Sequence, residues 1–89
     1  MKHINITIFG KVQNVGFRFN AKKWADSFDL TGFVKNRDDG SVYIEVEGEA
    51  EALGQFENWC EEGSAFSRVK RIKTEHGDIK DFDEFEITY

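Results

Sequence analysis

Hydrophobic and polar residues alternate along several short stretches of this chain, beginning near its N-terminus. The isoleucines at positions 4, 6 and 8 are separated by polar residues, which is the period of two expected for a strand with one buried face. A similar alternation runs over 41–47 and over 84–89, and the stretches 33–37 and 68–76 also have strand character. The pattern therefore predicts five strands.

Two longer stretches between these strands have the spacing of amphipathic helices. The first follows Gly16, ends before Gly32 and carries its apolar residues on one face: Phe17, Ala21, Trp24, Ala25 and Phe28. The second covers 49–62, has an acidic start and turns these residues inward: Leu53, Phe56, Trp59 and Cys60. The resulting order is β-α-β-β-α-β with a short extra strand at the C-terminal end. Two helices of this length cover one face of an antiparallel sheet, so we expect an α+β sandwich of the ferredoxin-like type.

Length and composition favour one domain that spans residues 1–89. Nine Phe, two Trp and two Tyr can supply the dense core that so short a chain requires. The lone Cys60 excludes an intrachain disulfide and is expected to be an inert core thiol. The N-terminal stretch has no long apolar run, which predicts neither a signal peptide nor a membrane helix and favours a cytoplasmic location. The net charge of −5 argues against nucleic acid or an anionic membrane as the partner.

The segment 10–18, Gly-Lys-Val-Gln-Asn-Val-Gly-Phe-Arg, joins the end of the first predicted strand to the start of the first predicted helix. Backbone N–H groups in such a loop can converge with the unpaired N–H groups of a helix's first turn, and a phosphate fits such a ring of donors. Arg18 would add a planar, permanently charged fork for two phosphoryl oxygens. Taken alone, the segment is equally typical of an ordinary strand–helix turn with a solvated arginine.

A second segment, Gly-Phe-Val-Lys-Asn at 32–36, leads into Asp38-Asp39-Gly40, which is a strong hairpin signal. The side-chain amide of Asn36 could position a water molecule, because an amide both accepts and donates hydrogen bonds. An asparagine near the end of a strand more often serves the turn, so this segment alone leaves its role open.

Taken together, the two segments closely resemble the acylphosphatase family, whose hallmark is a G-x-V-Q-G-V-x-F-R loop followed by a G-x-V-x-N strand. The resemblance spans nearly the whole chain, because Gly48-Glu49, Gly63-Ser64 and the ending at 85–89 also look like family positions. Asn14 stands where the family usually has glycine. Asparagine is among the few residues that tolerate the left-handed conformation, so the loop can keep its path.

The resemblance implies a small free-standing enzyme that hydrolyses acyl phosphates to a carboxylate and inorganic phosphate. Arg18 matches the family's substrate-binding arginine, and Asn36 matches the asparagine that orients the attacking water. The phosphate-binding loop would consist of the backbone amides of Gln13, Asn14, Val15, Gly16, Phe17 and Arg18. The family likeness implies a monomer that uses no metal ion and no other cofactor.

Two other functional classes remain as alternatives. A domain of the same fold could hold a phosphate or a partner without catalysis, and an extensively apolar open sheet face would instead favour a protein-interaction module. An RNA-binding function is disfavoured, because Glu45 and Glu47 follow Tyr43 on the face where RNA would lie. His3 and His76 lack metal-ligand spacing and are expected to be surface strand residues.

Overall fold

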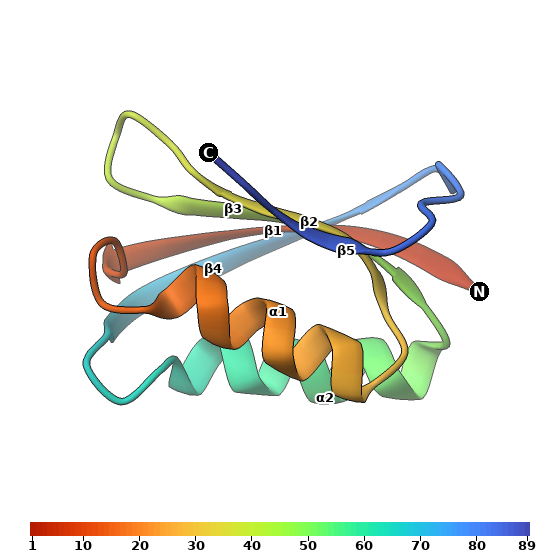
Figure 1. The fold of residues 1–89 in the computed structure, drawn as a ribbon, viewed down its shortest axis with the longest axis horizontal. Coiled ribbons are helices and arrows are strands. Elements are labelled where there is room, and N and C mark those ends of the chain that lie inside the picture. The colour runs from red at the N-terminus through yellow and green to blue at the C-terminus, as the bar shows by residue number, and fades with distance from the viewer.

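The computed structural model describes all residues of the chain, Met1–Tyr89. Five strands and two helices follow one another in this order: β1 (Lys2–Lys11), α1 (Phe17–Ser27), β2 (Thr31–Asn36), β3 (Val42–Gly48), α2 (Ala50–Glu62), β4 (Arg68–Gly77) and β5 (Phe85–Thr88). Figure 1 shows the strands as one layer with both helices lying beneath the same face. Every element that the sequence pattern predicts is present, and the α+β ferredoxin-like architecture is confirmed.

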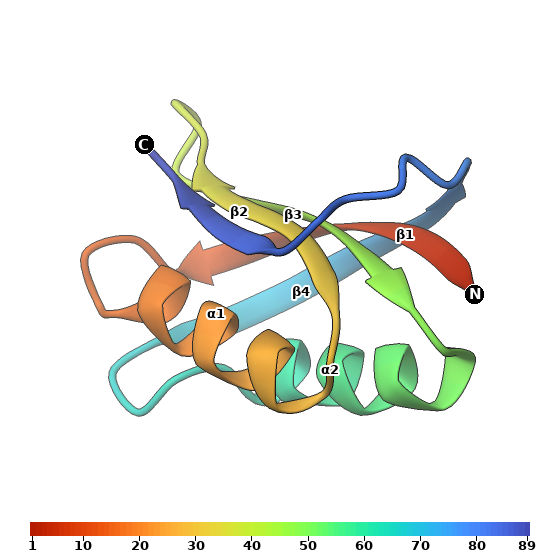
Figure 2. The same ribbon diagram turned by 45° about the vertical axis from the view of Figure 1, so that its right-hand side comes forward.

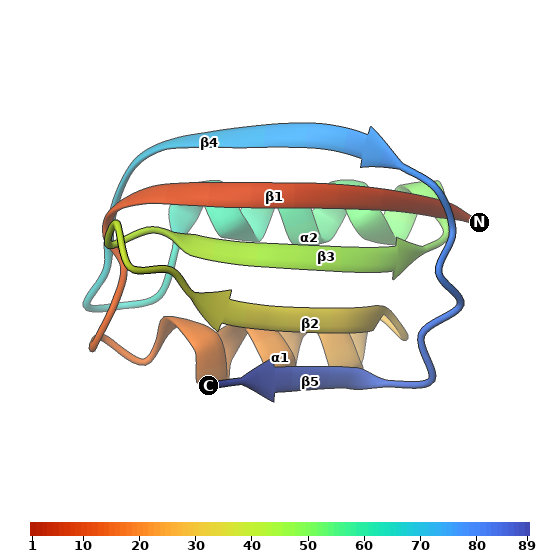
Figure 3. The same cartoon turned by 90° about the horizontal axis from the view of Figure 1, so that it is seen from above.

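The sheet has the strand order β4-β1-β3-β2-β5, visible from above in Figure 3. Neighbouring strands are antiparallel except at one edge, where β5 pairs with β2 in parallel. The sheet is therefore mixed, whereas the sequence analysis expected an antiparallel one. The reason is topological: β4 ends at the end of the sheet where β2 begins, so the strand that starts there must run in the direction of β2.

The core lies between the sheet and the two helices. Alternate residues of β1 and β3 supply its aliphatic part, and Phe17 and Phe56 supply large rings from the helices. Figure 2 shows both helices beneath the twisted sheet, and the core side chains lie between these two layers. Trp24, expected in the core, is 42% exposed, but its ring stacks on Phe28 and lies against Trp59. The predicted inward face of α2 is confirmed, since all four of its residues are buried: Leu53, Phe56, Trp59 and Cys60.

The other face of the sheet is partly covered by the connection between β4 and β5. The carboxylate of Glu47 accepts hydrogen bonds from the backbone N–H groups of Lys80, Asp81 and Phe82, which ties this connection to β3. His3 lies beneath it with only 2% of its surface exposed, and its Nδ1 is 2.7 Å from Glu47 Oε2. The expectation of a surface position for His3 is therefore wrong, because nothing in the alternation of residues indicates that a later connection covers this face.

The strand directions bring three chain segments to one end of the sheet. Strands β1 and β2 are both antiparallel to β3, and β5 is parallel to β2, so all three run in the same direction. The loop after β1, the end of β2 and the C-terminus consequently lie together, at the left in Figure 1. Both segments that the sequence analysis selected for their chemistry end at this place.

Candidate active site

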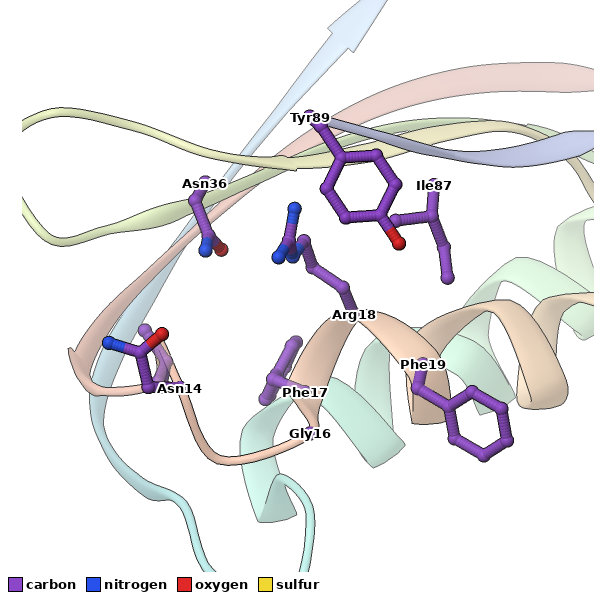
Figure 4. Close-up of a pocket in the computed structure, with 9 residues that line it drawn as sticks. Asn14, Gly16, Phe17, Arg18, Phe19, Asn36, Ile87 and Tyr89 are labelled. Carbon is purple, nitrogen blue, oxygen red and sulfur yellow. The ribbon is translucent and has the colours of Figure 1, made fainter.

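A cavity of about 180 Å³ opens at this end of the sheet. Figure 4 shows the side chains that surround it, which come from the loop after β1, the start of α1, the end of β2 and the C-terminal segment. Its lining consists of Val12, Asn14, Gly16, Phe17, Arg18, Phe19, Asn36, Ile87 and Tyr89. The structure thus places Arg18 and Asn36 at one cavity. Of the predicted loop residues, Asn14, Gly16 and Phe17 also line it, while Gln13 and Val15 do not.

The loop from Val12 to Gly16 takes a path that requires two left-handed residues. Asn14 has φ of 61° and Gly16 has φ of 77°, which a glycine or an asparagine adopts at little cost. No side chain caps the first turn of α1. The backbone N–H groups of residues 14–18 donate no hydrogen bond within the chain. These groups are therefore available to a negatively charged ligand.

The side chain of Gln13 fastens this loop to the hairpin between β2 and β3. Its Nε2 donates hydrogen bonds to the carbonyl oxygens of Arg37, at 2.7 Å, and Ser41, at 2.9 Å. Ser41 is held in turn by Asp39, which accepts hydrogen bonds from both its hydroxyl and its N–H; these bonds lower the pKa of the Asp39 carboxyl. This positioning role was not predicted, since the sequence motif names Gln13 without showing what its side chain contacts.

Arg18, in the first turn of α1, is held by the C-terminal segment. Its Nη1 donates to the carbonyl oxygen of Thr88 at 3.2 Å, and its guanidinium carbon lies 4.5 Å from the centre of the Tyr89 ring. In Figure 4 the guanidinium lies between Asn36 on one side and Tyr89 and Ile87 on the other. Only one hydrogen bond from this guanidinium goes to the chain, so most of its donors remain available to a ligand.

Asn36 is the last residue of β2, beyond which the chain enters the hairpin. Its Oδ1 is buried and has no hydrogen-bond partner within the chain. Leaving a buried acceptor unpaired costs about 1–3 kcal/mol, and such groups in native proteins usually have a bound water or a functional role. The orphaned oxygen therefore marks a place at the cavity where a donor such as water would be held.

The C-terminal side of the cavity was missed by the sequence analysis. It expected Phe85, Ile87 and Tyr89 to share one face of the last strand, but a strand's alternation does not identify its neighbour in the sheet. Because β5 pairs with β2 rather than with β4, Ile87 and Tyr89 lie beside the first turn of α1 and complete the cavity. Nothing in the sequence indicated that Phe19 lines the cavity, apart from its being an aromatic residue on the exposed side of α1.

The remaining groups with displaced pKa values lie away from this cavity. Burial raises the pKa of Tyr43 to about 12, and a hydrogen bond to Glu45 adds to this effect. No three His, Cys, Asp or Glu side chains are grouped in a way that could hold a metal ion. No helix has the length and apolar character required to span a membrane.

Comparison with known proteins identifies the family. The acylphosphatase family model matches residues 4–87. The acylphosphatase of Bacillus licheniformis is 43% identical over 90 aligned positions that include all of both chains. The crystal structure of the Bacillus subtilis acylphosphatase superposes with a TM-score of 0.97 at 40% identity, with all of both chains covered. The structure of an acylphosphatase from Coxiella burnetii superposes with a TM-score of 0.94 at 32% identity, and the match covers 98% of this chain and 92% of the other. With its fold, its two-part motif and these full-length relatives in agreement, this chain belongs to the acylphosphatase family.

Proposed function

We propose that this chain hydrolyses acyl phosphates to a carboxylate and inorganic phosphate, with Arg18 and the loop amides holding the phosphoryl group and Asn36 orienting water. Membership of the acylphosphatase family supports the reaction class. The assignment of roles rests on one observation above all: the unpaired Oδ1 of Asn36 is at the same cavity as Arg18 and the loop's free N–H groups.

The phosphoryl group would be bound by charge and by preorganised donors. In phosphoryl transfer the negative charge is spread over the peripheral oxygens in a loose transition state, so fixed donors placed around them are the main requirement. The guanidinium of Arg18 offers two parallel donors, and residues 14–18 offer unpaired N–H groups from the loop and from the start of α1. Thr88 and Tyr89 restrict the movement of the guanidinium before the substrate arrives.

The attacking water would donate a hydrogen bond to Asn36 Oδ1. This bond gives the unpaired Oδ1 a hydrogen-bond partner and holds the water on one side of the reacting phosphorus atom. An amide does not titrate near neutral pH, so Asn36 acts by orientation and the substrate's own phosphate serves as the proton acceptor. The displaced carboxylate is a weak base, so the mechanism needs no general acid, and it assigns no role to a metal ion. The proposed mechanism uses Arg18, Asn36 and the loop amides of one copy, so we propose that the chain acts as a monomer.

A non-catalytic phosphate-binding domain is the competing function, since it would use the same cradle. It gives no reason for an unpaired buried amide oxygen beside that cradle, whereas a hydrolase requires a held water there. The interaction-module alternative loses support, because the open face holds His3, Glu45 and Glu47 and is partly covered by the chain itself.

The test is hydrolysis of acetyl phosphate by the purified protein, with and without a chelator, beside Arg18→Ala and Asn36→Ala. The matched controls are Arg68→Ala and Asn58→Ala, which remove exposed side chains of the same types outside the cavity. We expect activity that survives the chelator and falls at least about 100-fold in kcat/KM for Arg18→Ala. For Asn36→Ala we expect a fall of similar size confined mainly to kcat. Phosphate binding without turnover by the well-folded protein would instead establish the non-catalytic domain.

A further inference from the structure

The cavity has two chemically different sides. Asn14, Gly16 and Asn36 form the polar side, while Phe19, Ile87 and Tyr89 form a side of apolar surface. Two of these apolar residues are large aromatic side chains that face solvent, with Phe19 68% exposed and Tyr89 96% exposed. The Tyr89 ring contacts the Arg18 guanidinium, whereas the Phe19 ring makes no aromatic or cation–π contact within the chain. Exposed aromatic residues at the edge of a polar pocket are typical of a surface that binds an apolar group.

In the proposed reaction, the polar and apolar sides of the cavity lie on opposite sides of the reacting phosphorus atom. In phosphoryl transfer the attacking and leaving oxygens are roughly in line, so water and leaving group occupy opposite ends. If the water is held by Asn36, the carboxylate departs on the opposite side. Figure 4 places Ile87 and Tyr89 on the side of the Arg18 guanidinium away from Asn36, and Phe19 projects from α1 below them.

We propose that Phe19, Ile87 and Tyr89 form a binding surface for the acyl group, and that this enzyme therefore favours acyl phosphates with an aromatic or other bulky apolar acyl group over acetyl phosphate. This proposal rests on the proposed hydrolysis and on the role of Asn36. The cradle binds the phosphoryl group that all such substrates share, so it cannot distinguish between them. Apart from the intrinsic reactivity of each substrate, any preference among acyl groups must come from the surface next to the departing carboxylate.

The surface is suited to a planar ring. Ile87 provides a half-buried aliphatic surface packed against the core, and the aromatic rings of Phe19, from α1, and Tyr89, from the C-terminal segment, line the same cavity. An acyl group with a phenyl ring can make offset or edge contacts with both aromatic side chains, whereas a methyl group reaches neither with useful area. Aromatic pairs of this kind change affinity by about 2- to 10-fold beyond their buried area.

The test compares kcat/KM for benzoyl phosphate with kcat/KM for acetyl phosphate in the wild-type protein, in Phe19→Ala and in Phe66→Ala. Phe19 is chosen because Tyr89 also contacts Arg18, so its replacement would disturb the phosphate site. Phe66 is also an exposed aromatic residue, lies outside the cavity and serves as the matched control. Comparing the ratio between variants cancels the different intrinsic reactivities of the two substrates.

We expect the benzoyl-to-acetyl ratio of kcat/KM to fall by about 3- to 10-fold in Phe19→Ala and to stay at the wild-type value in Phe66→Ala. Inhibition by phenylphosphonate, which cannot lose its organic group, should weaken by a similar factor in Phe19→Ala, while inhibition by methylphosphonate should not. An unchanged ratio, or an equal loss for both substrates, would overturn the acyl-binding surface while leaving hydrolysis itself established. Absence of hydrolysis of both acetyl phosphate and benzoyl phosphate by the wild-type protein would overturn the proposed function, and this inference with it.

Discussion

The side-chain amide nitrogen of Gln13 lies 2.7 Å from the carbonyl oxygen of Arg37 and donates a hydrogen bond to it. These two residues belong to the segments that follow β1 and β2, so the bond joins the loop after β1 directly to the hairpin beyond Asn36. A second bond from the same nitrogen reaches the carbonyl oxygen of Ser41 on the other arm of that hairpin. One glutamine side chain therefore helps to fix the position of the loop proposed to hold the phosphoryl group relative to Asn36, which is proposed to orient water.

Replacing Gln13 with alanine should lower both stability and turnover. The change removes two hydrogen bonds, which should reduce the free energy of unfolding by about 1–3 kcal/mol. Both carbonyl oxygens keep a backbone partner, since that of Arg37 also accepts from Gly40 N–H and that of Ser41 from Arg37 N–H. Amide hydrogen exchange should accelerate in the hairpin at residues 37–41. Gln55→Ala, an exposed change on α2, is the matched control and should alter neither quantity. Stability and hairpin exchange that match the control would show that Gln13 does not fasten the loop.

Asn14 should be replaceable by glycine but not by alanine. Its φ of 61° is a conformation that glycine and asparagine adopt readily, whereas a residue such as alanine is strained there by about 1–2 kcal/mol. We expect Asn14→Gly to retain acyl phosphate hydrolysis within about threefold of the wild type, and Asn14→Ala to lose stability and activity. The measurements are thermal unfolding and kcat/KM for acetyl phosphate. Equal activity of the glycine and alanine variants would mean that the left-handed turn is not required.

Glu47 should give the protein a stability that is lost in acid. Burial alone would raise the pKa of its carboxyl, but hydrogen bonds donated by the backbone of Lys80 and by His3 outweigh this and hold the pKa below its ordinary value. A carboxyl whose pKa is lower in the folded state stabilises the protein above its unfolded pKa, about 4.3, and this contribution disappears as the pH falls through the folded value.

The corresponding measurement is the free energy of unfolding between about pH 3 and pH 7 for the wild type and Glu47→Gln. The wild type should lose stability towards the acid end more steeply than the variant, because the variant has no carboxyl to protonate at this place. Glu51→Gln changes an exposed carboxyl in the first turn of α2 and should keep the wild-type slope. Parallel curves for the wild type and Glu47→Gln would contradict the role assigned to this carboxyl.

Cys60 should be unreactive in the folded protein. It is completely buried on the inner face of α2, and burial raises the pKa of its thiol well above the ordinary value, with Glu57 and Glu61 adding to the shift. Since the thiolate is the reactive form, alkylation by iodoacetamide at neutral pH should proceed only as fast as the protein opens. Mass spectrometry should show complete modification in denaturant and almost none in native buffer over the same time. Rapid native labelling would mean that this part of α2 is accessible.

The helices, strands and turns could be predicted from the sequence alone, because the residues that specify each of them are close together in the chain. The alternation at 4, 6 and 8 lies within β1, and the glycine and asparagine of the loop adopt the left-handed conformations that their types permit. The family resemblance predicted that Arg18 and Asn36 belong to one site, and the structure places both at one cavity.

The sequence by itself determined the elements, their order and the two segments of candidate chemistry, since each depends on neighbours within a few turns of chain. Only the tertiary structure decided that β5 returns parallel to β2, that the connection before it buries His3, and that Ile87 and Tyr89 face Asn36 across Arg18. Those relationships join residues separated by most of the chain. They are set by which strand edges remain free once the core has formed, a property that the periodicity of a single strand does not encode.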